Sequence, residues 1–191
     1  MLDNLKKYDI LLGSASPRRR ELLSTLGLNF TIKTISGIEE TYPEDLTPEQ
    51  VPGYLSRLKA SAYTLTPTQL LITADTVVIN DGIVLGKPTD RADAIRMLRS
   101  LSAKTHKVVT GVSITTVQKQ KSFSVETLVT FDTLSDEEIT HYVDTYKPFD
   151  KAGSYGIQEW IGCIAVSRIE GSFYNVIGLP VQRLYQELKY F

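Results

Sequence analysis

The most constraining feature of this sequence is the run from Leu70 to Ile79, which reads LLITADTVVI. Apart from Ala74 and Asp75, the run is apolar and rich in β-branched residues, and this composition favours a buried β-strand. An aspartate in such a strand loses its contact with water, which is costly for a charged group. Buried carboxylates form an ion pair, bind a metal, or accept a proton during a reaction. A structural salt bridge, a metal ligand and a catalytic base are therefore the alternatives for Asp75.

Helix-start signals occur on both sides of this run. Ser16 and Pro17 begin a helical pattern with leucines on one face, because Ser can cap a helix and Pro fits its first position. The segment Thr47–Gln50 has the pattern of a capping box, and Ser135 with Glu138 forms a second one. Strand and helix signals thus alternate along the chain.

The alternation predicts the fold class. The expected strands are Tyr8–Gly13, Phe30–Ile32, Leu70–Ile79, Ile83–Leu85, Lys107–Val117, Phe123–Phe131 and Cys163–Ile169. Helices are expected after Ser16, after Thr47–Gln50, after Thr89 or Asp90, after Ser135, and over Pro180–Leu188. We expect an α/β fold with a mixed, twisted sheet, flanking helices and two lobes around a central cleft. Residues 1–191 are expected to form a single domain.

Composition excludes several classes of protein. The chain has 191 residues, with 21 Lys and Arg against 22 Asp and Glu and a net charge of -1. This balance argues against a nucleic-acid or acidic-membrane partner, because either would attract a basic surface. No apolar stretch approaches the roughly 20 residues that span a bilayer. A single cysteine, Cys163, cannot form an intramolecular disulfide, so we expect a cytoplasmic protein; its apolar neighbours predict a buried, unreactive thiol.

The segment Gly13-Ser14-Ala15-Ser16-Pro17-Arg18-Arg19 lies where a strand ends and a helix begins. Small residues let the backbone approach a ligand closely, and a helix N-terminus attracts anions. Arginines add planar cationic donors that bind phosphate oxygens in pairs. A phosphate site and a capped surface helix are both consistent with this segment.

Three further segments contain candidate binding residues. Lys87 follows the second strand of a hairpin, where it could contact a phosphate or simply be solvated. Glu39 and Glu40 follow the Phe30–Ile32 strand and are candidate oxygen ligands for Mg²⁺ or Mn²⁺, although exposed loop acids are common. Gln158 ends the glycine-containing loop KAGSYGIQ, and its amide could pair with a nucleobase edge or belong to an ordinary turn.

Taken together, these segments resemble the Maf family of nucleoside triphosphate pyrophosphatases, which includes the septum formation protein Maf. The resembling blocks, in chain order, are GSASPRRRELL, ISGIEETYP, LKASAY, TADTVV, LGKPTD, VVTGVSI, KAGSYGIQ and NVIGLP. The resemblance implies hydrolysis of the α–β phosphoanhydride of a nucleoside triphosphate to a monophosphate and pyrophosphate, with a divalent metal cation. It also implies a fold similar to that of the inosine triphosphate pyrophosphatases and a house-cleaning role that removes non-standard or surplus nucleotides.

The resemblance also implies roles for individual residues. Asp75 matches the family's proton acceptor and, with Glu39, belongs to the expected metal site. The positions that match the family's phosphate-binding residues are Ser14, Arg18, Arg19, Lys59 and Lys87. Such chemistry depends on positioning and on charge neutralisation, which cationic side chains and a metal both provide.

Three positions imply the substrate. The family branch that acts on dTTP and UTP has Arg after Ser-Pro, Thr after the catalytic Asp, and Gln at the end of YGIQ. These residues are Arg18, Thr76 and Gln158 here, whereas a sister branch acting on 7-methylguanosine triphosphate has Trp, Gln and Glu. A neutral amide suits a neutral pyrimidine edge, and a carboxylate suits a cationic methylated purine. The resemblance therefore implies dTTP and UTP.

One departure from the family pattern leaves alternatives open. Glu159 and Trp160 follow Gln158 where the family usually has small residues. The same chemistry on modified or purine nucleotides is one alternative, and a non-catalytic nucleotide-binding regulator of cell division is another. The partner is expected to be a nucleoside triphosphate, and a homodimer is left open.

Overall fold

The computed structural model describes residues 2–191, and the chain divides into two compact units. The first unit contains the chain up to Asp75 together with Thr110–Val125 and Gly178–Phe191. The second unit contains Thr76–Val109 and Glu126–Ile177. Each unit is therefore assembled from stretches that are distant in sequence.

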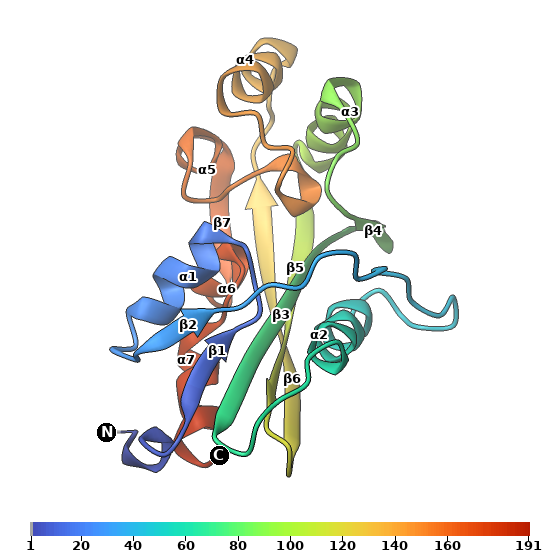
Figure 1. Ribbon diagram of the computed structural model, residues 1–191. Coiled ribbons are helices and arrows are strands. Elements are labelled where there is room, and N and C mark those ends of the chain that lie inside the picture. The colour runs from blue at the N-terminus through green and yellow to red at the C-terminus, as the bar shows by residue number, and fades with distance from the viewer. Residues whose placement is uncertain (1) are drawn as a thin grey trace. The chain divides into compact units, whose positions relative to one another are not determined.

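The strands form a mixed sheet, as the sequence predicts (Figure 1). Within the described residues, seven strands are hydrogen-bonded in the order β2-β1-β3-β5-β6-β7, and β4 pairs with β3. Their bounds are β1 Asp9–Leu12, β2 Phe30–Ile32, β3 Gln69–Asn80, β4 Ile83–Leu85, β5 Thr105–Thr115, β6 Gln120–Phe131 and β7 Val166–Glu170. β1 is parallel to β2 and β3, whereas the pairs β3–β4 and β6–β7 are antiparallel. This sheet with its helices confirms the α/β class.

The helices are α1 Pro17–Ser24, α2 Val51–Ser61, α3 Arg91–Leu101, α4 Asp136–Tyr146, α5 Trp160–Ala165, α6 Phe173–Ile177 and α7 Val181–Lys189. The helices α1, α3 and α4 begin at the capping residues that the sequence predicts, whereas α5 and α6 were not expected. The Ser16 side chain accepts a hydrogen bond from the Arg19 amide at the start of α1. Ser135 and Glu138 form a complete capping box at α4. These bonds satisfy amides that have no partner within the helix.

In the first unit, α2 packs on β1 and β3 through a small apolar cluster of Leu11, Ala60 and Leu71. The first turn of α2 also lies directly against β5. A Cβ atom at Gly111 would be only 2.3 Å from the carbonyl group of Pro52, so a larger residue at Gly111 would push α2 away from β5. Pro52 is tolerated because it lies in the first turn, where a helix amide has no intrahelical partner.

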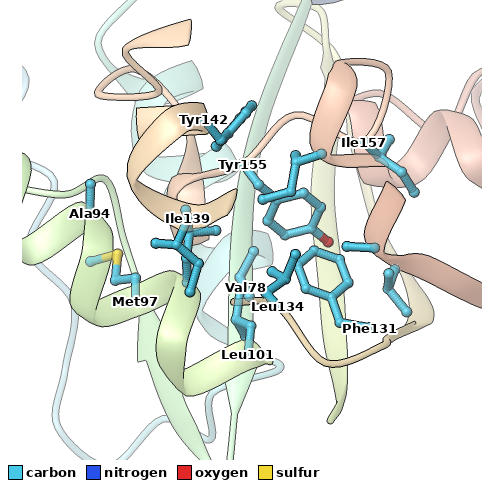
Figure 2. Close-up of a cluster of buried hydrophobic side chains, with 14 of the residues drawn as sticks. Val78, Ala94, Met97, Leu101, Phe131, Leu134, Ile139, Tyr142, Tyr155 and Ile157 are labelled. Atoms are coloured by element: carbon cyan, nitrogen blue, oxygen red, sulfur yellow. The ribbon is translucent and has the colours of Figure 1, made fainter. Parts of the chain in front are cut away.

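The second unit contains a large apolar core (Figure 2). Its buried members include Val78 from β3, Leu98 from α3 and Ile139 from α4. The rings of Phe131 and Tyr155 meet edge to face with centroids 4.9 Å apart. This core joins α3 and α4 to the strands of their own unit.

His106 is buried within that core and contacts both aromatic rings, with centroids 5.0 Å from Phe131 and 5.5 Å from Tyr155. Its Nε2 atom shares a 2.8 Å hydrogen bond with the Tyr155 hydroxyl. Burial lowers the pKa of His106 to about 4, because the protonated ring would lose its hydration. The imidazole is therefore neutral at physiological pH.

Two expectations about the segment around Cys163 are wrong. The strand expected over Cys163–Ile169 begins only at Val166, because the preceding residues form α5. The thiol of Cys163 is exposed rather than buried. On a helix only one face points to the core, and in α5 that face carries Ile161 and Ala165.

Among residues 2–191, no helix combines the length and the apolar character that a membrane span requires.

Candidate active site

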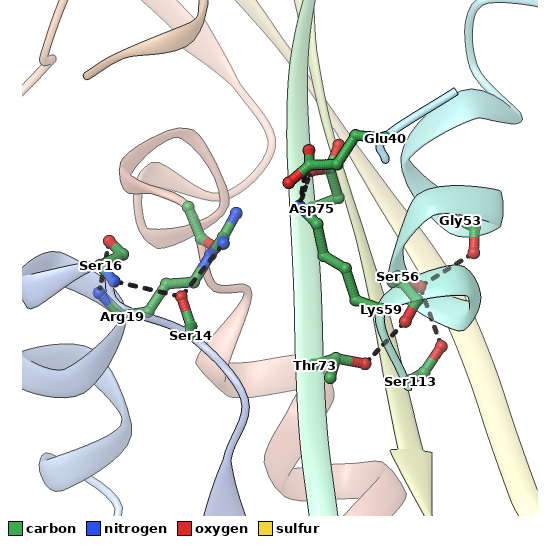
Figure 3. Close-up of polar contacts among 11 residues, drawn as sticks. Ser14, Ser16, Arg19, Glu40, Gly53, Ser56, Lys59, Thr73, Asp75 and Ser113 are labelled. Atoms are coloured by element: carbon green, nitrogen blue, oxygen red, sulfur yellow. Dashed lines mark hydrogen bonds and ion pairs between the residues drawn. The ribbon is translucent and has the colours of Figure 1, made fainter. Parts of the chain in front are cut away.

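The candidate site is built on β3 and α2 of the first unit. Thr73 and Asp75 are two residues apart on β3 and therefore share one face of the strand. Ser56 and Lys59 are three residues apart on α2 and share one face of the helix. Thr73 Oγ1 donates to the Ser56 carbonyl at 2.7 Å, and Lys59 Nζ donates to Asp75 Oδ1 at 2.6 Å (Figure 3). Both contacts join the same faces of α2 and β3.

Lys59 lies between two carboxylates. Its Nζ atom is 2.6 Å from Asp75 Oδ1 and 3.0 Å from Glu40 Oε2. The side chains of Lys59 and Asp75 are only 15% and 11% exposed, whereas that of Glu40 is 47% exposed. Asp75 is thus ion-paired, as one of the sequence-based alternatives requires. The two carboxylates thus share one ammonium group.

The Ser14 loop and the first turn of α1 form another part of the first unit's polar cluster. Ser14 Oγ accepts hydrogen bonds from the Ser16 amide at 3.3 Å and from Arg19 Nη1 at 3.4 Å. Arg19 Nε donates to the Gly178 carbonyl at 2.9 Å, so the C-terminal segment of the unit holds this guanidinium in place. The loop lies close to β3, because a Cβ atom at Gly13 would be 2.8 Å from the Thr73 methyl group.

The charge of Arg19 is coupled to the carboxylate on β3. Burial lowers the pKa of Arg19, the nearby carboxylate of Asp75 raises it, and the guanidinium of Arg18 lowers it. The guanidinium stays protonated, because an arginine side chain does not lose its proton in proteins. Asp75 and Arg18 are therefore both close enough to Arg19 for their charges to act on it.

A chain of hydroxyl groups lies beneath this cluster. Ser56 Oγ donates to the Gly53 carbonyl at 2.9 Å and is 2.9 Å from Ser113 Oγ, which is 2.9 Å from Ser122 Oγ. The three serines come from α2, β5 and β6, so no local sequence pattern predicts their contact. They hold α2 against the strands on the side away from solvent.

The predicted site residues are divided between the units. Ser14, Arg18, Arg19, Lys59 and Asp75 all belong to the first unit. Ser14 contacts Arg19, Lys59 contacts Asp75, and Arg19 is coupled electrostatically to Asp75 and Arg18. The residue that forms the ion pair with Lys59 is Glu40, rather than the adjacent Glu39. Glu39 is exposed, and its role stays a sequence-based prediction.

Thr76, Lys87 and Gln158 belong to the second unit. Thr76 is half-buried, and Lys87 and Gln158 are exposed. The loops around Lys87 and Gln158 are connected, because the Gly153 amide donates to the Gly86 carbonyl at 3.0 Å. The substrate-specificity roles of Arg18, Thr76 and Gln158 stay predictions.

The structure shows which groups contact Glu159, the acidic residue that departs from the family pattern. The carboxylate of Glu159 accepts a hydrogen bond from the Tyr142 hydroxyl and lies 3.1 Å from Lys151 Nζ. No local pattern predicts the contact with Tyr142, which lies 17 residues before Glu159 in the chain. Glu159 is therefore held by contacts within the second unit.

The chemistry of the first unit's carboxylates suits a hard divalent cation. Within the described part of the chain, no three His, Cys, Asp or Glu side chains gather closely enough to bind a metal between them. Asp75 and Glu40 nonetheless meet at Lys59. Mg²⁺ is commonly bound by one or two carboxylates together with substrate phosphates, so this donor set fits a cation that arrives with a polyphosphate.

Comparison with known sequences identifies the family. Residues 9–191 match the sequence model of a family described as Maf-like protein. The chain belongs to the Maf family. Two relatives similar to this Maf chain are both named dTTP/UTP pyrophosphatase. One, from Porphyromonas gingivalis, is 62% identical over 100% of this chain and 98% of its own length. The other, from Phocaeicola vulgatus, is 61% identical over 99% of each.

A solved structure is also similar to this Maf chain. It is described as a nucleoside-triphosphatase / dITP/XTP pyrophosphatase from Mycobacterium abscessus. The two chains are 12% identical with a TM-score of 0.44, over 94% of this chain and 93% of that one.

Proposed function

We propose that this Maf protein hydrolyses dTTP and UTP at the α–β phosphoanhydride, releasing a nucleoside monophosphate and pyrophosphate. The observation that carries the proposal is the Asp75 carboxylate, which belongs to a side chain that is only 11% exposed and is held by Lys59 at 2.6 Å. The same unit contains Ser14, Arg18 and Arg19. Relatives at 62% and 61% identity with the name dTTP/UTP pyrophosphatase support the choice of nucleotides.

In the proposed reaction, Asp75 acts as the general base. Its carboxylate accepts a proton from a water molecule while the water oxygen attacks the α-phosphorus. The bond from that phosphorus to the α–β bridging oxygen breaks, and the electron pair leaves with pyrophosphate. Lys59 orients the carboxylate through its contact with Oδ1, which keeps the other oxygen of the same group correctly placed.

Cationic side chains neutralise the charge of the polyphosphate in this proposal. Ser14 and Arg19 form one hydrogen-bonded unit at the N-terminus of α1, where backbone amides also favour anions. Arg18, Lys59 and Lys87 are proposed to contribute further positive charge. Phosphoryl transfer depends mainly on such positioning and electrostatic stabilisation.

A divalent cation, Mg²⁺ or Mn²⁺, completes the proposal. The carboxylates of Asp75 and Glu40 would hold it, with Glu39 as the adjacent acidic candidate. When bound, such a cation neutralises phosphate charge and makes a bound water more acidic. Together with Lys59, the cation would balance the negative charge of the triphosphate.

Nucleotide choice is proposed to depend on Arg18, Thr76 and Gln158. A neutral glutamine amide can both donate to and accept from a pyrimidine edge. Glu159 raised the alternative of a purine or modified substrate, but its carboxylate is engaged by Tyr142 and Lys151. This engagement favours the pyrimidine proposal. The cytoplasm is the proposed compartment, because a chain with one cysteine has no need of an oxidising environment.

The decisive experiment is a panel of nucleoside triphosphates incubated with the purified protein and Mg²⁺ or Mn²⁺. Monophosphate, pyrophosphate and orthophosphate are measured separately. We expect dTTP and UTP to be hydrolysed with equal amounts of monophosphate and pyrophosphate. Release of orthophosphate would refute cleavage at the α–β bond, a purine preference would refute the substrate, and binding without turnover would favour the regulator.

A further inference from the structure

The turn that contains Gln158 has a buried side and an exposed side. The Glu159 amide donates to the Gly156 carbonyl at 2.9 Å, which closes a four-residue turn. Ile157 lies in the apolar core with 5% exposure, whereas Gln158 is exposed. Ile157 therefore anchors the turn, and Gln158 presents its amide to solvent.

One hydroxyl group contacts both ends of this turn. The Gly156 amide donates to the Tyr142 hydroxyl oxygen at 3.0 Å, and the same hydroxyl donates to the Glu159 carboxylate. Tyr142 is fully buried on α4, so water does not replace either bond. Burial and the hydrogen bond to Glu159 raise the pKa of Tyr142, so the hydroxyl remains a donor at physiological pH. These two bonds hold the first and last residues of the turn at a fixed separation.

Lys151 supports the same arrangement from the preceding loop. Its Nζ atom lies 3.1 Å from Glu159 and 2.8 Å from Asp150, and its side chain is only 9% exposed. A Cβ atom at Gly156 would be 2.9 Å from the Glu159 side chain and 3.1 Å from that of Lys151. Only glycine at this position lets the ion pair pack directly against the turn.

The helix after the turn is fitted to it equally closely. A Cβ atom at Gly162 on α5 would lie 1.8 Å from the Ile157 carbonyl oxygen, where any side chain is excluded. The turn is thus held by the Tyr142 hydroxyl, by the Lys151–Glu159 ion pair and by the backbone of α5. None of these groups is needed to perform the chemistry assigned to the first unit.

We propose that Tyr142 is a positioning residue for nucleotide selection, because its hydroxyl holds the turn that presents Gln158. This inference rests on the proposed function, in which Gln158 pairs with the pyrimidine. A displaced Gln158 loses hydrogen bonds to the base in the ground state and the transition state alike, so binding should suffer more than turnover. Tyr142 should therefore affect KM and the preference for dTTP over purine nucleotides, while leaving kcat nearly unchanged.

The test compares Tyr142→Phe with Tyr146→Phe. Tyr146 lies one turn further along α4, stacks on Tyr142 with ring centroids 5.1 Å apart, and is 38% exposed. We expect Tyr142→Phe to raise KM for dTTP about five- to tenfold with kcat within about twofold, as for one or two lost hydrogen bonds. The dTTP-to-GTP ratio of kcat/KM should fall by a similar factor, and Tyr146→Phe should behave as wild type. Amide hydrogen exchange at Gly156 should accelerate in Tyr142→Phe alone.

The outcomes separate the two proposals. Absence of dTTP and UTP hydrolysis by the wild-type protein would overturn the proposed function. An active wild type with unchanged KM and selectivity in Tyr142→Phe would overturn the positioning role alone. If Tyr142→Phe does not fold, Glu159→Ala is the alternative variant. It removes the carboxylate to which the Tyr142 hydroxyl donates, and it should raise KM for dTTP in the same way. Unchanged kinetics in Glu159→Ala would then overturn the inference.

Discussion

The Lys59–Asp75 pair of the first unit and the Lys151–Glu159 pair of the second contain the same two kinds of charge in different surroundings. Each lysine contacts a second carboxylate, Glu40 for Lys59 and Asp150 for Lys151. The neighbours differ, because the charge of Asp75 is coupled to that of Arg19, whereas Glu159 accepts a hydrogen bond from the Tyr142 hydroxyl. Lys151 and Glu159 are enclosed by a glycine turn.

This difference shows what an ion pair can do in each setting. In the first unit, where the Arg19 guanidinium acts on Asp75, the proposed role of the pair is to orient a reactive carboxylate. In the second unit, Lys151 and Glu159 pair with each other, and Glu159 also accepts a hydrogen bond from the Tyr142 hydroxyl. These contacts hold the backbone of the turn in place. Changes in the first unit should therefore alter turnover, and changes in the second should alter stability or substrate choice.

The largest effect is expected from Asp75→Asn. An amide cannot accept the proton from water, so kcat should fall between about 100- and 10,000-fold, the range typical of a lost general base. Nucleotide binding, measured by calorimetry, should change little. The control is Asp81→Asn, which alters a carboxylate that pairs with Lys104 at the same 2.6 Å but is exposed. An active Asp75→Asn protein would assign the base to another residue.

The next effect concerns the stability of the second unit as pH changes. Burial lowers the pKa of His106 from 6.5 to about 4, so the unfolded chain binds this proton more tightly than the folded chain. The contribution of His106 is complete above pH 6.5 and is lost as pH falls towards 4, by about 3 kcal/mol. Urea unfolding between pH 7 and pH 4 measures it. His106→Gln should flatten this dependence, whereas a change at the exposed His141 should not.

A somewhat smaller effect is expected from Lys59→Met. Asp75 and Glu40 lose their shared cation, and kcat/KM for dTTP should fall about 10- to 100-fold, because hydrogen bonds to charged groups contribute about 1.5–3 kcal/mol. Lys104→Met breaks the exposed 2.6 Å pair with Asp81 and is the matched control. Equal losses of kcat/KM in the two variants would mean that the enclosed position of Lys59 does not contribute to activity.

The smallest effect is expected from Gln158→Glu. The added charge replaces an amide donor, and kcat/KM for dTTP and UTP should fall about fivefold, in line with one lost hydrogen bond. The melting temperature should stay near the wild-type value because Gln158 is exposed. Gln186→Glu, on the exposed surface of α7, controls for the added charge. Unaltered nucleotide preference would remove Gln158 from base recognition.

Local patterns predicted the elements well where capping or turn chemistry was explicit. Ser16 and Ser135 cap helices as their side chains suggest, and Asp81 and Gly82 form the turn between β3 and β4. The segment around Cys163 was assigned incorrectly because a short apolar run fits a buried strand and a helix equally well. In α5 only Ile161 and Ala165 are buried, and this division into a buried and an exposed face depends on packing against the rest of the unit.

The family, the α/β class and the kinds of residue available for chemistry can all be inferred from the sequence. The pairing of Asp75 with Lys59, the additional contact with Glu40 and the bond from the turn before α5 to Tyr142 become visible only in the folded chain. The physical reason is the separation along the chain of the residues that interact. Periodicity and caps reflect interactions over a few residues, whereas these contacts depend on how helices register against strands and turns.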